Sequence, residues 1–213
     1  MAEDKIYVQT LNDFIAVAAS KSHTPGGGNV SAVVGTLAAS MVAMVGNLTV
    51  ANKKYADHHA EAQALTDRMM ALIEKLKELT NKDIEAFDAY MGVFKMPKDT
   101  DEEKAARAKA MQDCAKAATN VPLEICRTCL SIIKEADELS KYGNLMAISD
   151  VGVGAMVGEA ALRACMLSVD INLPSIKDAD FVAAAKAERA RLFTEAEEYK
   201  IKALARVKEK MGS

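Results

Sequence analysis

Residues 24–50 read TPGGGNVSAVVGTLAASMVAMVGNLTV and decide the fold of this 213-residue chain. Three consecutive glycines lie between a proline and a long run of small and apolar residues. Ordering them is costly, because glycine loses more backbone freedom on folding than any other residue. The run from Val30 to Val50 is long enough to raise the question of a membrane span, but Ser, Thr, Gly and Asn residues interrupt it and it lacks a Leu/Ile/Phe-rich centre. It therefore predicts a buried helix.

Patterns typical of helices cover most of the remaining chain, because apolar residues recur every three or four positions. The expected helices span 10–21, 29–50, 53–94, 101–140 with a bend near Pro122, about 150–168 with Ser149 or Asp150 as its cap, and 178–210. Thr100 and Glu103 predict a capping box, and residues 169–178 predict an extended linker containing Pro174. No strand pattern is found. We predict an all-α, multi-helix up-and-down bundle with two long helices, as a single domain over residues 1–213.

The composition argues against several classes of protein. Half of the residues are hydrophobic and the formal net charge is −3, which is unlike the basic surface of a nucleic-acid binder. The N-terminal sequence MAEDKIYVQTLNDF lacks the basic start and apolar core of a secretory signal, so we expect a cytoplasmic protein. Cys126 and Cys129 form a C-x-x-C pair inside a helical pattern, with no second ligand pair at zinc spacing. We expect reduced core thiols and no metal site, and we expect the histidines to lie at the surface.

The glycine loop does not match a nucleotide-binding motif. A dinucleotide fingerprint needs a preceding strand, and a P-loop needs Gly-Lys-Ser/Thr after its glycines. Here a helix precedes the glycines and Asn29 follows them. Two interpretations remain: a tight connection that needs positive φ angles, or a loop that lets a ligand approach the N-terminus of the next helix, where N–H groups and a partial positive charge suit an anion or a polar ring edge. Three glycines after a proline favour the second.

Three polar features carry the remaining functional signal. Asp83 lies where the apolar line of the helix over 53–94 should place a leucine, which is costly unless the carboxylate is paired or functional. Asp150 is either an ordinary helix cap or an ionised carboxylate at a helix N-terminus. Lys53, Lys54 and Tyr55 begin a helix, where cations are unfavourable, so they are either solvated or bind an anion.

Several motifs occur in an order that resembles a known family. They are TPGGGNVSAVVGTLAASMVAMVGNLT, NKKY, DIEAFDAYMGVFKMPKDTDEEKAAR, VPLEICR, GNLMAISDVGVGA and INL. Together they are similar to the formiminotransferase-cyclodeaminase C-terminal family, whose stand-alone bacterial members include methenyltetrahydrofolate cyclohydrolases. The resemblance spans residues 10 to 175. It implies an all-helical subunit that forms dimers or higher oligomers, and a folate substrate with its one-carbon unit between N5 and N10.

The resemblance implies two related reactions. One is hydrolysis of 5,10-methenyltetrahydrofolate to 10-formyltetrahydrofolate, and the other is cyclodeamination of formiminotetrahydrofolate with release of ammonia. We favour the hydrolysis, because no formiminotransferase module is found in the 213 residues and because segments 83–110 and 143–153 closely match stand-alone cyclohydrolases. The competing class is a helical scaffold without catalytic activity, in which Asp83 is only ion-paired and the glycines only form a turn.

Under this resemblance we expect Asp83 and Asp150 to be the catalytic carboxylates, with the base and acid roles left open. The expected substrate-binding residues are Ser22, Pro25, Gly26, Gly27, Gly28, Asn29, Lys53, Lys54, Tyr55 and Asn144. The residues around the glycines would shape the pterin or one-carbon site, Asn144 would add amide hydrogen bonds, and the two lysines would meet the anionic glutamate tail. No metal or redox cofactor is expected, because hydration changes no oxidation state.

We also expect association between subunits. The small-residue helices over 29–50 and 150–168 contain five glycines, at positions 35, 46, 152, 154 and 158, which allow close contact between helices. The apolar faces exceed what one thin bundle needs to cover. We therefore predict a homodimer or a higher homo-oligomer, with the folate site near the subunit boundary as the resemblance suggests.

Overall fold

The computed structural model describes residues 6–212, and this part of the chain forms helices without a strand. The α-helices are α1 (Leu11–Ala18), α2 (Gly27–Val50), α3 (His59–Val93), α4 (Asp101–Leu139), α5 (Ile148–Asn172) and α6 (Ala179–Met211). Short 3₁₀ helices cover Lys53–His58, Leu145–Ala147 and Leu173–Ser175. The predicted all-α class is confirmed.

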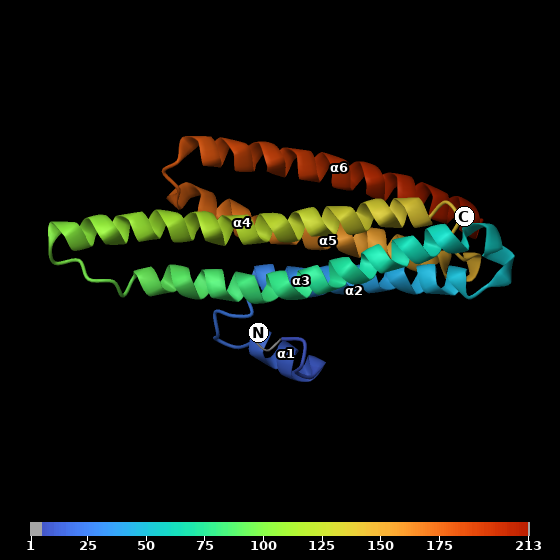
Figure 1. Cartoon of the computed structure of the whole chain (residues 1–213), viewed down its shortest axis with the longest axis horizontal. Helices are drawn as coiled ribbons and strands as arrows, with labels where there is room; N and C mark the ends of the chain where they lie inside the picture. Colours follow the sequence, from blue (N-terminus) through green and yellow to red (C-terminus); the bar gives the residue numbers. More distant parts are fainter. Residues whose placement is uncertain (1–5, 213) are drawn as a thin grey trace.

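The helices form an elongated up-and-down bundle (Figure 1). Helices α2, α3, α4 and α5 pack together as the centre of the bundle, and α6 covers α4 and α5. Helices α3 and α4, with 35 and 39 residues, extend beyond the others and are joined by a loop at the tip. The short helix α1 lies outside the bundle and has no buried residue. The two predicted long helices are therefore present.

Local capping explains where several helices begin. Thr100 Oγ1 accepts a hydrogen bond from the backbone N–H of Glu103 at 3.2 Å, and the Glu103 carboxylate accepts one from the Thr100 N–H at 3.1 Å. This is the predicted capping box, which satisfies two N–H groups that have no partner within the helix. Asp178 caps α6 in a similar way, through the N–H of Phe181.

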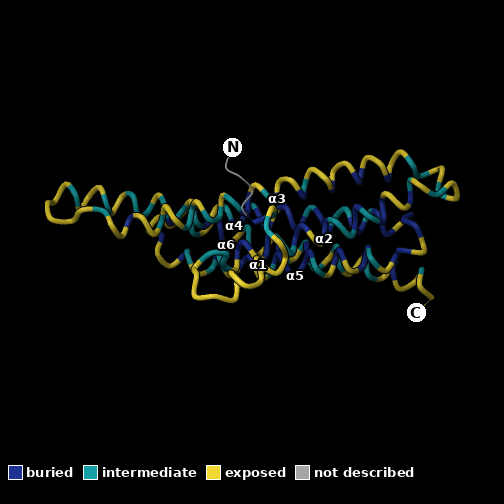
Figure 2. Tube along the Cα trace, turned by 90° about the horizontal axis from the view of Figure 1, so that it is seen from below, coloured by how far each residue is buried: buried dark blue, intermediate teal, exposed yellow. Residues whose placement is uncertain are grey.

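Helices α2 and α5 pack closely against each other in the core, and Figure 2 shows both helices buried along much of their length. A Cβ atom on Gly154 would lie 2.5 Å from Val42 Cγ2 and 3.1 Å from the Ala38 carbonyl oxygen. Gly158 faces Ile133 of α4 in the same way. These glycines therefore serve contacts within one subunit, and they do not by themselves indicate association.

By length and hydropathy, α2 and the stretch Leu145–Ser175 would each be long and apolar enough to cross a membrane. Half of the most apolar window of each is buried inside the bundle, as expected of core helices. In the described part of the chain the four cysteines are free, and Cys126, Cys129 and Cys165 are buried, as predicted for core thiols. No group of three or more His, Cys, Asp or Glu side chains within residues 6–212 has the arrangement of a metal site.

Three boundaries differ from the prediction. The segment over 169–178 is not extended: α5 continues to Asn172 and is followed by a 3₁₀ turn, because Pro174 lies near the start of that turn, where its missing N–H is not needed. Neither Ser149 nor Asp150 caps α5, since the helix already begins at Ile148 after a 3₁₀ turn capped by Asn144. Residues 53–58 are a separate 3₁₀ segment, because Tyr55 has non-helical backbone angles.

Candidate active site

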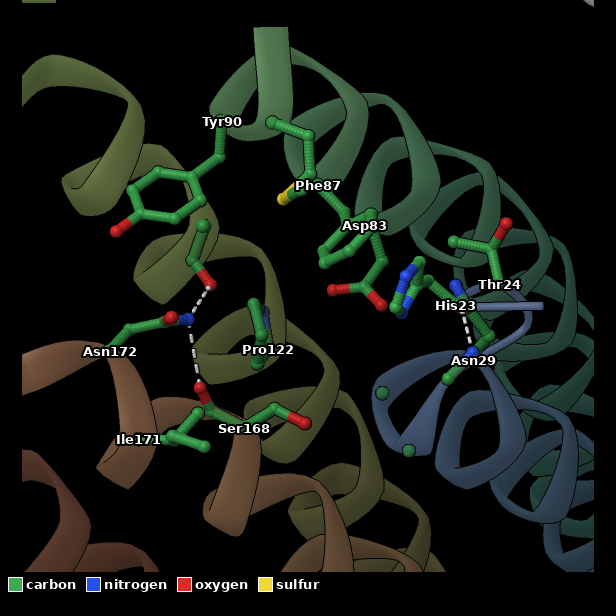
Figure 3. Close-up of a pocket in the computed structure, with 15 residues that line it drawn as sticks. His23, Thr24, Asn29, Asp83, Phe87, Tyr90, Pro122, Ser168, Ile171 and Asn172 are labelled. Carbon is green, nitrogen blue, oxygen red and sulfur yellow. Dashed lines mark hydrogen bonds between the residues drawn. The ribbon is translucent and has the colours of Figure 1, made fainter. Parts of the chain in front are cut away.

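The N-terminal turn of α2 and parts of α3, α4 and α5 enclose a cavity of about 460 Å³ (Figure 3). A volume of this size suits a small-molecule ligand. The lining residues are His23, Thr24, Gly26, Gly27, Gly28, Asn29, Asp83, Phe87, Tyr90, Met91, Ala118, Pro122, Ser168, Ile171 and Asn172. Several residues singled out in the sequence therefore meet here.

Asp83 is the carboxylate of this cavity. It continues the apolar line of α3, in which Leu76 and Leu79 are buried and Phe87 follows one turn later. Within residues 6–212, its carboxylate has neither a hydrogen bond nor an ion pair, so the ion-pair interpretation is wrong for the described part of the chain. Burial raises the pKa of Asp83 from 3.8 to about 6, because the charged form loses solvation without gaining a partner.

The third glycine of the loop, Gly28, is explained by its short distance to Asp83. A Cβ atom on Gly28 would lie 2.5 Å from Asp83 Oδ2 and 3.0 Å from Asp83 Cγ. Only a residue without a side chain allows the first turn of α2 to lie this close to the carboxylate. Within the described residues, positive φ angles occur only at Gly212, so the interpretation as a turn that needs positive φ is wrong. The glycine at position 28 therefore permits a close approach of the Asp83 carboxylate, a group of the same chain, to the first turn of α2.

Asn29 holds the loop in place. Its Oδ1 accepts a hydrogen bond from the Gly26 N–H at 2.8 Å, and its Nδ2 donates to the Thr80 carbonyl at 3.0 Å. The side chain is 1% exposed, so its amide joins α2 to α3 instead of facing a ligand. Ser22 is exposed and donates to the Thr24 carbonyl, and in the described structure neither Ser22 nor Pro25 lines the cavity.

The other predicted site residues lie at the opposite end of the bundle. Asp83 is 24 positions after the start of α3 at His59, which corresponds to about 36 Å along the helix. Lys53, Lys54 and Tyr55 precede that start, and Asp150 lies in the first turn of α5 at the same end. One subunit therefore does not bring Asp150 to Asp83.

At this second end, polar groups connect the loops. Tyr55 Oη accepts a hydrogen bond from the Leu145 N–H at 2.9 Å. Asn144 donates from its backbone to Thr49 Oγ1 at 2.9 Å and from Nδ2 to the Leu48 carbonyl at 3.0 Å. Lys54 and Tyr55 line a separate cavity of about 490 Å³ together with Asp57, Lys141 and Lys210. Lys141 is paired with Glu138, and Lys210 donates to the Lys141 carbonyl. Asn144 thus has a structural role, while Lys53 and Lys54 form no ion pair within residues 6–212 and remain available to an anion.

Comparison with known proteins assigns the chain to a family. A model of the formiminotransferase-cyclodeaminase family matches residues 10–191. The chain belongs to this family. It is 40% identical over 188 residues to a methenyltetrahydrofolate cyclohydrolase of Methylorubrum extorquens, covering 88% of this chain and 90% of that protein. The resemblance inferred from the motifs is therefore confirmed.

Two further relatives place the chain within the family. It is 32% identical over 194 residues to a formimidoyltransferase-cyclodeaminase of Sus scrofa, covering 91% of this chain but only 36% of that protein. The chain thus spans about a third of the length of this longer relative. A crystal structure of formiminotetrahydrofolate cyclodeaminase from Thermotoga maritima superposes with a TM-score of 0.84 at 29% identity, covering 96% of both chains. The family fold is shared over nearly the whole length.

The cavity also contains residues that were not predicted from the sequence as site residues. Phe87 and Tyr90 present aromatic rings from α3, and the His23 ring lies 6.1 Å from the Phe87 ring. Ser168 and Asn172 lie on the last turns of α5. The signal for Asn172 was present in the motif INL, but that segment was interpreted as a linker.

Proposed function

We propose that this chain hydrolyses 5,10-methenyltetrahydrofolate to 10-formyltetrahydrofolate. The observation that carries the proposal is Asp83, which has no ion-pair or hydrogen-bond partner among residues 6–212. Its burial brings its pKa to about 6, and it lines a cavity of ligand size. A general acid or base is most effective when its pKa is near the working pH. The match to the Methylorubrum cyclohydrolase, at 40% identity over 90% of its length, favours hydrolysis over cyclodeamination.

The chemistry requires one group to exchange protons at the reacting carbon. The methenyl carbon belongs to a delocalised cation between N5 and N10, and water adds to it while the Asp83 carboxylate takes one proton. The protonated Asp83 then gives that proton to N5 as the bond between the carbon and N5 breaks. The remaining hydroxyl proton leaves to solvent as the formyl C=O forms, so the reaction releases one proton overall. A pKa of about 6 allows Asp83 to serve in both steps.

Cyclodeamination is the second candidate, because the structural neighbour from Thermotoga is a formiminotetrahydrofolate cyclodeaminase. The same carboxyl group could protonate the leaving ammonia. Neither reaction changes an oxidation state, so we propose that no metal or redox cofactor takes part. A cytoplasmic location, where reduced folates would be available, completes this proposal.

An assay on purified protein distinguishes the candidates. We expect rapid loss of the absorbance of 5,10-methenyltetrahydrofolate, and a much lower kcat/KM for ammonia release from 5-formiminotetrahydrofolate. The reverse order of the two kcat/KM values would identify a cyclodeaminase. If neither substrate is converted and neither shifts the melting temperature, the chain is a helical scaffold without this activity.

We further propose that two copies pair in antiparallel orientation along α2 and α3. An apolar groove of about 760 Å³ lies along these helices, lined among others by Leu37, Met44, Leu48 and Met70. Leu37 is 58% exposed, which is unusual for a large apolar side chain next to a groove. A protein partner would cover it. We propose a second copy of this chain as that partner, because it also explains why the predicted site residues lie at two opposite ends of one subunit.

The spacing along α2 supports the second copy. Ser40 lines the groove and lies midway in sequence between Gly27, which begins α2, and Lys53, which begins the 3₁₀ helix after α2. A two-fold axis near Ser40 would place the Lys53 and Asp150 end of one copy beside the Asp83 cavity of the other, because an isologous contact pairs each end with its opposite. The basic end could then hold the glutamate tail of a folate bound at Asp83.

Subunit mixing tests this arrangement. We expect light scattering to give the mass of a dimer at micromolar protein, and Leu37→Glu to give a monomer with little activity. Ile201→Glu, on exposed α6, is the matched control and should stay dimeric. Lys54 of one copy would bind the glutamate tail of a folate held at Asp83 of the other, so Lys54→Glu should be poorly active at substrate concentrations below KM. At such concentrations, mixed and re-equilibrated Asp83→Asn and Lys54→Glu subunits should recover up to about a quarter of wild-type activity, because half of the dimers would contain one intact site. A monomeric wild type, or no recovery on mixing, would contradict the proposal.

A further inference from the structure

Pro122 creates an open hydrogen-bond acceptor in the wall of the cavity. It lies inside α4, and because proline has no backbone N–H, the carbonyl of Ala118 lacks its usual helical partner. Asn172, the last residue of α5, supplies the missing donor: its Nδ2 lies 2.9 Å from the Ala118 carbonyl oxygen. The same Nδ2 lies 2.9 Å from the Ser168 carbonyl oxygen. Figure 3 shows these contacts, with Pro122 between Asn172 and Asp83 in this view.

These two bonds fix the orientation of the Asn172 amide. Both partners are carbonyl oxygens, which only accept hydrogen bonds, so the NH₂ group must face them and both of its protons are used. The amide oxygen, Oδ1, therefore lies on the other branch of the side chain. It has no hydrogen-bond partner among residues 6–212, although Asn172 lines the cavity.

We propose that Asn172 Oδ1 accepts a hydrogen bond from the amino-pyrimidinone edge of the pterin ring, and so helps to select the ring of the substrate; this inference rests on the proposed function. The methenyl bridge between N5 and N10 has no N–H to donate. The pterin ring has several N–H donors, including its 2-amino group and N3–H. The glutamate tail has a single amide N–H. The carboxylates next to it would repel an acceptor oxygen.

The walls of the cavity fit a flat ring in this orientation. Phe87 and Tyr90 lie on α3 together with Asp83, whereas Asn172 lies on α5. A pterin ring that packs against the two aromatic side chains would direct its bridge carbon to Asp83 and its distal edge to Asn172. Asp83 then exchanges the proton at the reacting bond, and Asn172 recognises the pterin ring.

The test separates this binding role from the structural one. Asn172→Ala removes Oδ1 but also leaves the Ala118 carbonyl without a donor. Pro122→Ala restores a backbone N–H at position 122, which can bond to that carbonyl within α4. We therefore compare Asn172→Ala with wild type, and the double variant Pro122→Ala/Asn172→Ala with Pro122→Ala.

In both comparisons, loss of Oδ1 should raise the KM for 5,10-methenyltetrahydrofolate by about tenfold, the scale of one net hydrogen bond, with kcat much less affected. The fall in melting temperature should be smaller in the Pro122→Ala background. A KM effect that disappears in that background, or a loss confined to kcat, would overturn the inference.

A tail-free tetrahydropterin tests the choice of ring edge without turnover. Its dissociation constant, measured by calorimetry, should rise by a similar factor when Asn172 is replaced. Unchanged affinity for the tail-free pterin would overturn the inference even if the folate KM rises. An inactive wild type that still binds the pterin through Asn172 would contradict the proposed reaction and leave this inference standing.

Discussion

Replacing Asp83 with asparagine should lower kcat/KM for 5,10-methenyltetrahydrofolate by at least about 100-fold, the usual scale for loss of a positioned acid or base. Asparagine keeps the size of the side chain but neither takes up nor releases a proton in this pH range. KM should change much less than kcat, because the proton transfers occur in the transition state. Asp88→Asn is a suitable control, since Asp88 is an exposed carboxylate of the same helix outside the cavity.

The same variant should be more stable than wild type at pH 7.5. The pKa of Asp83 is raised in the folded state from 3.8 to about 6, so the folded protein binds an extra proton between these values. Stability from this group therefore falls as pH rises from about 4 to 6 and stays low above that range. Two pKa units correspond to about 3 kcal/mol as an upper limit, and Asp83→Asn should recover part of it at pH 7.5 but almost nothing at pH 4. Urea unfolding at both pH values measures the difference. A loss of stability at pH 7.5 would instead indicate a buried cationic partner.

Gly28→Ala should abolish most of the activity while the helical fold remains. The added methyl group would lie 2.5 Å from Asp83 Oδ2, so the carboxylate has to rotate away from the first turn of α2. We expect kcat to fall by about 100-fold, because the acid or base is then displaced from its position. Circular dichroism should change little, since alanine favours a helix more than glycine does.

Gly27→Ala is the matched neighbour. Its Cβ would meet Ser168 Oγ at 3.8 Å, an ordinary contact, so its effect on kcat should be much smaller. The Gly28→Ala/Asp83→Asn double variant should be scarcely less active than Asp83→Asn alone, because both changes act on one carboxylate. Full additivity of the two losses, or similar losses for Gly27→Ala and Gly28→Ala, would contradict this explanation of the triple glycine.

The sequence predicted those features that depend on local patterns. Helices α3, α4 and α6 follow from apolar periodicity, and α2 follows from its long run of small and apolar residues. The start of α4 follows from Thr100 and Glu103. Asp83 was found because one carboxylate interrupts a long apolar line. The glycines were found because their entropic cost requires a structural reason. For Gly28 the structure supplies this reason as its short distance to Asp83.

The features that the sequence did not predict depend on tertiary contacts. Asn29 and Asn144 carry the polar groups expected of ligand contacts, but hydrogen bonds to other segments use them. Asn172 was missed because Pro174 suggested a linker, whereas a proline at the start of a 3₁₀ turn lets α5 continue. Asp83 and Asp150 were paired on the basis of the family resemblance and the chemistry of the reaction, although the length of α3 separates their ends of the bundle by about 36 Å.

The central claim is that Asp83 exchanges the proton during hydrolysis of the methenyl group. It is tested most directly by the pH dependence of kcat/KM for loss of 5,10-methenyltetrahydrofolate absorbance, corrected for uncatalysed hydrolysis, in wild type and Asp83→Asn. We expect the wild-type value to rise about tenfold per pH unit below about pH 6 and to level off above it, and we expect Asp83→Asn to lack this step. A wild-type profile that is flat through pH 6, or a step that persists in Asp83→Asn, would show that Asp83 does not exchange the proton.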